Sequence, residues 1–166
     1  PGGVTHLPAS VIAASSDNTM LTVRAGTRDG LGAGDVATVN FVHLLGKVNA
    51  ARTRDASVVP ITAKNAGDIE GVVIVDGLTM TLKARLSPTG KGTLVGDVED
   101  KRTEDGKAIE PQVGQDVRLL DNAGWPQTAQ MLIIGVIEDV RPSPRQPLRK
   151  QITVRPQVGD LSRVGE

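Results

Sequence analysis

The stretch Thr79–Leu86, with the sequence TMTLKARL, alternates strictly between polar and apolar residues. Its apolar side chains, at positions 80, 82, 84 and 86, fall on one face of an extended chain, and the threonines, lysine and arginine between them fall on the other. A period of two is typical of a β-strand with one buried face. It is the clearest indication of secondary structure in the chain.

Similar short segments surround this stretch, and turn residues separate them. Ser16–Thr19 and Asp29-Gly30 are turn signals, because Asp, Asn, Ser and Gly tolerate turn conformations. Gly46 interrupts one apolar segment and indicates a bulge or a close approach of another backbone. No segment shows a convincing helical stripe of apolar residues with caps. The further predicted strands are 10–15, 20–24, 36–41, 43–50, 57–62, 71–76, 92–98, 117–120, 130–140 and 151–155.

The composition agrees with an all-β protein. The chain has 166 residues, among them 21 valines and 9 isoleucines, which fit pleated sheets. Many short strands with frequent turns predict two small β-barrel subdomains built from mostly antiparallel strands. We expect a flexible lead-in at 1–8, a first subdomain at 9–76 and a second at 77–166, with strands that the two subdomains can share.

The charge balance disfavours nucleic acid as a partner. The chain carries 19 basic and 19 acidic side chains, whereas a general polyanion binder is basic. Phe41 and Trp125 are its only aromatic residues apart from histidine, so it lacks the stacking platforms of single-strand binders. Cysteine is absent, which excludes disulfides, thiolate nucleophiles and cysteine-based metal sites.

The sequence contains no recognisable catalytic, cofactor or metal motif. A catalytic triad needs a histidine, and only His6 and His43 are present. His6 lies in the lead-in, and we interpret His43 as a hydrogen-bonded histidine within a strand, on the same face as Phe41. Ser87–Thr93 (SPTGKGT) lacks the leading glycine of a phosphate loop and predicts a hairpin turn. The mixed charges of Asp97–Lys107 predict a solvated loop, not a calcium loop. We therefore expect no enzyme activity and no cofactor.

Two loops are candidates for contact with a partner. Trp125 lies in a turn, where it can anchor a protein interface or cap the end of a barrel. Arg141–Lys150 (RPSPRQPLRK) has four basic residues, three prolines and no acid. It can meet an acidic partner or an anionic surface, or remain a solvated hairpin loop.

Short motifs occur in a fixed order along nearly the whole chain, from about Ser10 to Val164. Together they resemble the extracytoplasmic β-domain of the MreC family of rod shape-determining proteins. A tryptophan stands at position 125, where that family usually has phenylalanine. The motifs that carry the resemblance are Gly26–Gly34 (GTRDGLGAG), Leu44–Val48 (LLGKV), Ser57–Thr62 (SVVPIT), Gly124–Pro126 (GWP), Ile134–Val136 (IGV), Val154–Pro156 (VRP) and Asp160–Leu161.

The resemblance implies a non-enzymatic cell-shape scaffold on the extracytoplasmic (periplasmic) side of the bacterial cytoplasmic membrane. It implies a membrane helix and a coiled coil before residue 1, self-association into a dimer or filament, links to MreB and MreD, and binding to the elongation-specific penicillin-binding transpeptidase of peptidoglycan synthesis. The candidate partner-binding residues are Trp125, Phe41, Leu44, Arg145 and Arg149.

Two alternative functions remain open at the level of sequence. One is an enzyme on a protease-like double β-barrel, in which His43 would have to meet an acid and a serine. The other is a ligand-binding β-barrel module.

Overall fold

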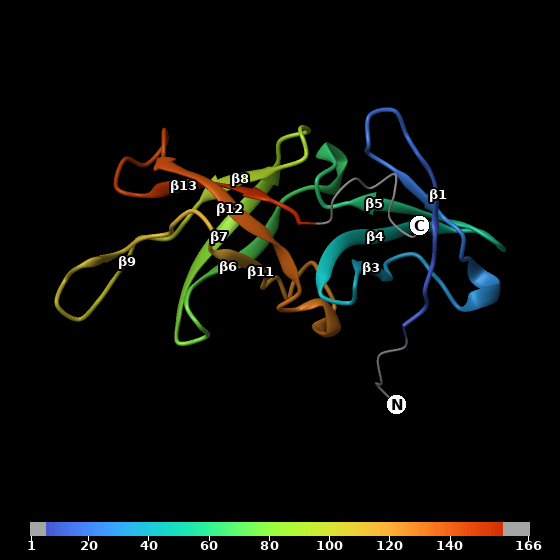
Figure 1. Ribbon diagram of the computed structural model, residues 1–166, viewed down its shortest axis with the longest axis horizontal. Coiled ribbons are helices and arrows are strands. Elements are labelled where there is room, and N and C mark those ends of the chain that lie inside the picture. The colour runs from blue at the N-terminus through green and yellow to red at the C-terminus, as the bar shows by residue number, and fades with distance from the viewer. Residues whose placement is uncertain (1–5, 158–166) are drawn as a thin grey trace.

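The computed structural model describes residues 6–157, and its regular structure is almost entirely β (Figure 1). Each predicted strand overlaps a strand of the structure, which confirms the all-β class. The three short 3₁₀ turns are Thr27–Asp29, Lys64–Ala66 and Gln127–Ala129. The strands are β1 (Val11–Ala14), β2 (Leu21–Val23), β3 (Val36–Val39), β4 (His43–Ala51), β5 (Ala56–Pro60), β6 (Ile69–Asp76), β7 (Met80–Pro88), β8 (Leu94–Asp97), β9 (Lys101–Arg102), β10 (Ala108–Ile109), β11 (Asp116–Leu119), β12 (Ile133–Pro142) and β13 (Lys150–Arg155).

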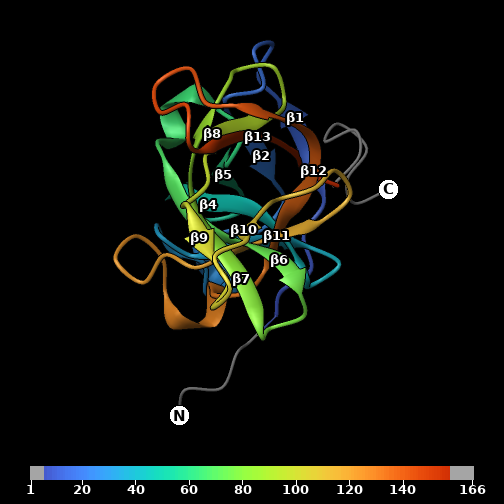
Figure 2. The ribbon, with the colours of Figure 1, turned by 90° about the vertical axis from the view of Figure 1, so that its left-hand side faces the viewer.

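Six strands close into an antiparallel barrel. Going round the ring, the order is β6, β7, β8, β13, β12, β11 and back to β6. Figure 2 shows this ring from the end of the molecule that lies farthest from β1. The alternation that predicted β7 decides its orientation: Leu82 and Leu86 are fully buried inside the barrel, whereas Lys83 and Arg85 are exposed outside.

The first five strands form a sheet with a second, smaller core. Its strand order is β1-β2-β5-β4-β3, and all of these pairings are antiparallel. Leu21, Leu45 and Val58 are among the buried residues of this core. The neighbouring residue Leu44 is also fully buried, but it belongs to the core of the barrel. Because successive side chains of a strand point to opposite faces, β4 contributes to both cores.

The predicted division between the two subdomains falls between two paired strands of the barrel. The predicted division at 76–77 assigns the residues of β6 to the first subdomain. In the structure β6 pairs with β7 and with β11, so it belongs to the closed ring. The turn around Gly77 is a hairpin that joins β6 and β7 within this ring.

The mixed-charge segment Asp97–Lys107 differs from the predicted loop. It includes β9, which pairs with β10 to form a separate two-stranded hairpin. The two pairs in this ladder are Ala108 with Arg102 and Ile109 with Lys101. Each strand has only two residues, and exposed charged side chains do not alternate with apolar ones. The apolar pattern therefore gave no signal for them.

Gly46 confirms the predicted close approach of another backbone. A Cβ atom at this position would lie 2.0 Å from the carbonyl oxygen of Val59 on the paired strand β5. No side chain fits in that space without a shift of the sheet backbone.

The turn between β1 and β2 is stabilised by a carboxylate, in agreement with the turn predicted at Ser16–Thr19. Asp17 accepts hydrogen bonds from the Thr19 hydroxyl and the Ser15 hydroxyl, both at 2.8 Å. These donors, and first of all the Thr19 hydroxyl, lower the pKa of the Asp17 carboxyl below its ordinary value of 3.8.

Residues 1–5 of the predicted lead-in and the Asp160–Leu161 motif lie outside the described residues. Within residues 6–157, the structure contains no helix of the length and apolarity that a membrane crossing requires.

Candidate functional site

The turn between β3 and β4 presents an aromatic residue to solvent in a strained conformation. Asn40 and Phe41 have φ angles of +54° and +64°. Asparagine adopts this left-handed region readily, whereas it costs a bulky residue such as phenylalanine about 1–2 kcal/mol. The Phe41 side chain is 57% exposed and that of Val42 is 48% exposed. A bulky aromatic residue in this conformation at the surface makes the turn a candidate contact site.

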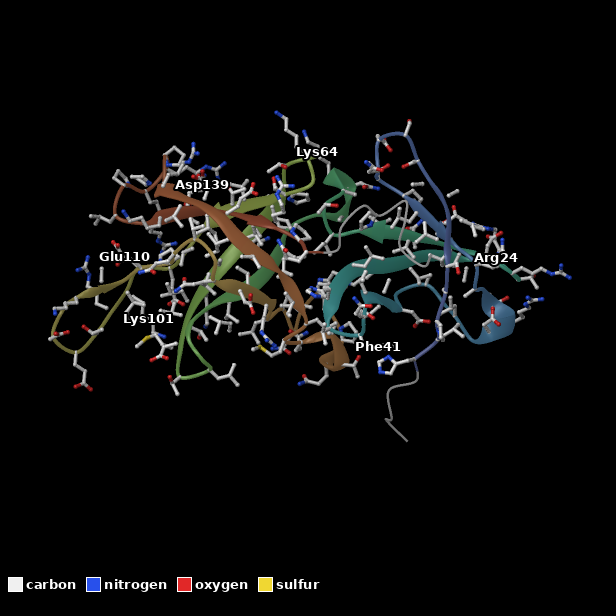
Figure 3. The ribbon with its side chains drawn as sticks, viewed as in Figure 1. Arg24, Phe41, Lys64, Lys101, Glu110 and Asp139 are labelled. Carbon is white, nitrogen blue, oxygen red and sulfur yellow. The ribbon has the colours of Figure 1, made fainter. Side chains whose placement is uncertain are left out.

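This turn lies where the sheet meets the barrel (Figure 3). The backbone N–H of Ile133 in β12 donates to the carbonyl oxygen of Val42 at 2.8 Å. Ile133 and His43 form the single parallel pair between β12 and β4. Phe41 also contacts the ring of His6, edge to face, at 4.7 Å between centroids. The predicted strand 36–41 thus ends at Val39, since the left-handed residues reverse the chain.

The hydrogen bond predicted for His43 is not formed at its Nδ1 atom. It begins β4 as predicted, but its Nδ1 atom is buried and has no hydrogen-bond partner among residues 6–157. A catalytic triad needs an acid at one ring nitrogen and a serine at the other. The acid contact is not formed at Nδ1. The part of the chain that the structure describes also contains no group of three or more potential metal ligands.

Trp125 lies on the loop between β11 and β12 and contacts the first half of the chain. It is half-buried and packs against the barrel core. The Lys47 ammonium of β4 lies over the indole ring, 4.2 Å from its centroid, and donates a hydrogen bond to the carbonyl oxygen of Gly124. A cation over the face of an indole is attracted by the ring quadrupole. The Lys47–Trp125 contact is therefore a second link between sheet and barrel.

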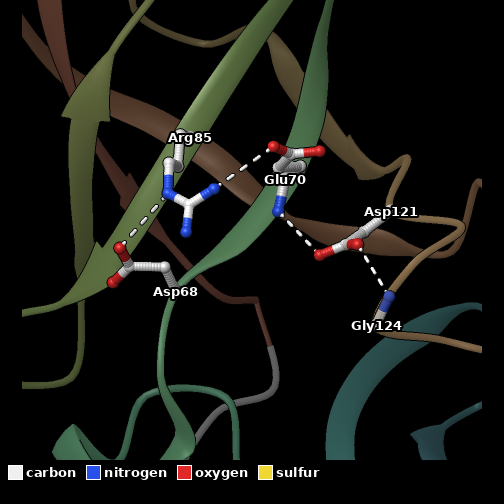
Figure 4. Close-up of polar contacts among 5 residues, drawn as sticks. All are labelled: Asp68, Glu70, Arg85, Asp121 and Gly124. Atoms are coloured by element: carbon white, nitrogen blue, oxygen red, sulfur yellow. Dashed lines mark hydrogen bonds and ion pairs between the residues drawn. The ribbon is translucent and has the colours of Figure 1, made fainter.

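Two polar side chains hold this loop in place. The Asp121 carboxylate accepts hydrogen bonds from the backbone N–H of Glu70 in β6, at 3.2 Å, and from that of Gly124, at 3.0 Å (Figure 4). The Gln130 amide donates at 3.1 Å to the carbonyl oxygens of Asp121, Trp125 and Pro126. Its Oε1 atom accepts from the N–H of Asp121 at 2.7 Å. The sequence analysis missed the roles of Gln130 and Lys47, because no local pattern shows which residues face a distant loop.

A groove of about 980 Å³ runs over the outer face of β6, β7 and β8. The loop after β11 and the β12–β13 loop border it. Its charged residues are four acids and four bases, so the groove does not favour ligands of one sign. Figure 4 shows Arg85 between Asp68 and Glu70, at 3.4 and 3.3 Å.

The five predicted partner-binding residues do not form one surface. Phe41 is exposed and Trp125 is half-buried, and both lie near the junction of the two halves. Arg145 and Arg149 are exposed on the β12–β13 loop and border the groove. Leu44 is 0% exposed, so its side chain cannot contact a partner in this structure. The alternation of side chains gave no signal for this burial, because it does not show that β4 is covered on both faces.

Comparison with known proteins gives matches to solved structures only. No family model matches the chain, and no curated protein matches it. MreC from Listeria monocytogenes is 18% identical, with a TM-score of 0.69, over 94% of this chain and 70% of that chain. MreC from Pseudomonas aeruginosa is 16% identical, with a TM-score of 0.67, over 92% of each chain. The major periplasmic domain of the cell shape-determining filament MreC is 20% identical, with a TM-score of 0.61, over 91% of this chain and 86% of that one. The described residues therefore have the fold of the MreC β-domain.

Proposed function

We propose that this chain is a non-enzymatic cell-shape scaffold, which associates with itself and positions peptidoglycan-synthesis proteins of the elongation machinery. The observation that carries the proposal is the likeness in fold to MreC domains over more than nine tenths of the chain. One of these structures is described as the periplasmic domain of a cell shape-determining filament.

The proposal includes a place and a set of partners. The chain would act on the extracytoplasmic side of the bacterial cytoplasmic membrane, anchored by a helix that precedes residue 1. Its partners would be further copies of itself, the elongation-specific penicillin-binding transpeptidase, MreD and MreB. A scaffold of this kind acts by position alone, so it needs a contact surface and no reacting group.

The β3–β4 turn is the part of the described surface best suited to such a contact. Phe41 and Val42 are adjacent exposed apolar residues, and protein interfaces use aromatic anchors of this kind. Phe41 stands at a positive φ that glycine would adopt without strain, so this turn combines a strained backbone with an exposed aromatic side chain. The turn is also tied to β12 through Val42, so it is presented rigidly.

The test replaces the anchor without disturbing the turn. Glycine adopts positive φ without strain, so Phe41→Gly should keep the backbone conformation and remove only the ring. Leu78→Gly is the matched control, because Leu78 is another large apolar residue at the surface, 75% exposed. Self-association is measured by sedimentation velocity, and binding to the purified extracytoplasmic part of the transpeptidase by biolayer interferometry.

We expect the wild-type chain to self-associate or to bind the transpeptidase, and Phe41→Gly to weaken that association by about tenfold or more. Leu78→Gly should stay close to wild type. Equal affinity of Phe41→Gly and wild type would show that the turn is not the contact surface. A wild-type chain that neither associates with itself nor binds the transpeptidase would contradict the scaffold function.

A further inference from the structure

The loop between β12 and β13 is strongly basic. It lies at the end of the barrel that is away from β1 (Figure 1). Residues 141–150 carry four basic side chains and no acidic one. Arg145 and Arg149 form no ion pair with any residue between 6 and 157. Arg141 does pair, with Asp139 of the same strand at 2.7 Å. The loop therefore has at least two arginines with their charge available to a partner.

The same loop exposes the most accessible large apolar side chain of the described surface. Leu148 is 81% exposed. It stands between Pro147 and Arg149, so an apolar tip is flanked by cationic side chains. Scattered single leucines are normal on protein surfaces. The combination of a protruding leucine with unpaired arginines on one loop is more specific.

The loop is preformed and does not need a partner to fold. The Ser143 side chain is 3% exposed, and its hydroxyl donates to the Asp97 carboxylate at 2.9 Å. The same hydroxyl accepts the backbone N–H groups of Arg145 and Gln146 at 3.2 Å. The N–H of Ser143 donates to the carbonyl oxygen of Arg149 at 2.9 Å, which closes the base of the loop. Three prolines restrict the backbone further.

We propose that this loop docks on an anionic lipid bilayer, with Leu148 in the interfacial region and Arg145 and Arg149 beside the headgroups. Charge complementarity supplies the attraction, because basic residues near an anionic leaflet each contribute to binding. The leucine favours a bilayer over a soluble polyanion, which has no apolar phase to receive it. A single protruding tip also suits a deformable lipid interface better than a protein partner, which requires roughly 800 Å² on each side. The proposal is independent of the scaffold function, since it rests only on this loop.

The experiment is co-sedimentation of the chain with vesicles. One set contains equal amounts of phosphatidylglycerol and phosphatidylcholine, and the other contains phosphatidylcholine alone, both at low ionic strength. The charge variant is Arg145→Gln with Arg149→Gln, and the apolar variant is Leu148→Ser. The matched control for charge is Arg24→Gln with Arg28→Gln, two exposed arginines of the first half.

Three further measurements complete the set. Leu78→Ser is the control for an exposed leucine outside the loop. Soluble polyglutamate is tested as a competing acidic ligand. Circular dichroism verifies that each variant is folded.

We expect binding to the anionic vesicles only. The charge variant should bind about 25-fold more weakly, from about fivefold for each arginine. Leu148→Ser should bind the anionic vesicles several-fold more weakly. The two controls, Arg24→Gln with Arg28→Gln and Leu78→Ser, should bind like wild type. Equal binding to neutral vesicles, no binding at all, or an unaffected charge variant would each overturn the proposal. If polyglutamate binds as tightly as the vesicles and Leu148→Ser has no effect, the loop is a site for acidic polymers and the bilayer proposal is wrong.

Discussion

Leu44→Ala tests whether Leu44 belongs to the core or to a partner-binding surface. The side chain is 0% exposed and lies in the barrel core although it comes from the sheet strand β4. Its replacement removes the buried methyl groups and leaves a cavity between the two halves. Fully buried Leu→Ala substitutions lower the free energy of unfolding by about 2.7–5.0 kcal/mol, and we expect a loss of about 3 kcal/mol. For a chain of this length, that corresponds to a decrease in Tm of about 6–12 °C.

Urea denaturation is the assay, because Trp125 is the only tryptophan of the chain and lies at the junction. Its fluorescence reports the sheet–barrel contact, and far-UV circular dichroism reports the strands. Leu78→Ala serves as the control, since Leu78 is 75% exposed and its truncation should change stability by about 0.5 kcal/mol or less.

The opposite pattern would refute this reasoning. If Leu44→Ala lost less than about 1 kcal/mol while its association with partners fell strongly, Leu44 would be a contact residue, as the sequence indicated. A loss of stability in the expected range assigns it to the core.

Three further outcomes follow from contacts described above. Gly46→Ala should lower the free energy of unfolding by at least about 2 kcal/mol, because the new Cβ atom would lie 2.0 Å from the Val59 carbonyl oxygen. If the variant had the wild-type Tm in thermal unfolding, the two strands would separate easily at this position. Lys47→Met should lower the free energy of unfolding by about 0.5–1 kcal/mol and change the fluorescence of Trp125. In a double-mutant cycle with Trp125→Leu, additive effects on stability would show that the two side chains do not interact. Because the pKa of Asp17 is lowered in the folded state, its carboxylate stabilises the fold above pH 3.8 and loses this effect as the pH falls through the lowered pKa. Titration of its side chain by NMR should give a value below 3.8, and a value at or above 3.8 would contradict the hydrogen bonds of the turn.

The sequence predicted the strands better than it predicted their arrangement. The alternation in Thr79–Leu86 indicated both β7 and the face that it buries, because burial on one face leaves a period of two. A glycine inside a strand pattern, Gly46, indicated a bulge or a close approach of another backbone, and the structure shows that this backbone is that of β5. Ring closure joins β6 to β11 and β8 to β13, which are far apart in the chain. Strand patterns contain no information on such pairings.

The candidate site shows the same limit. Phe41 was expected on the face of a strand with His43, but two left-handed residues reverse the chain and expose it. Nothing in the local pattern distinguishes an exposed turn phenylalanine from a buried strand phenylalanine. Trp125 was correctly placed on a loop, whereas its contact with Lys47 joins segments 78 residues apart. The basic loop was recognisable from composition alone, because its charge does not depend on tertiary contacts.

Because the barrel is closed, the two halves of the molecule differ in whether their strands are free to pair with another chain. A complete ring leaves no outer strand with a free row of backbone donors and acceptors. In the large sheet of the described residues, β1 and β3 are the strands that pair on one side only, and both belong to the first half. Any fibre that grew by adding strands to this sheet would therefore have a spine made of first halves. The barrels would lie on the outside of this spine, with their basic β12–β13 loops pointing away from the fibre axis.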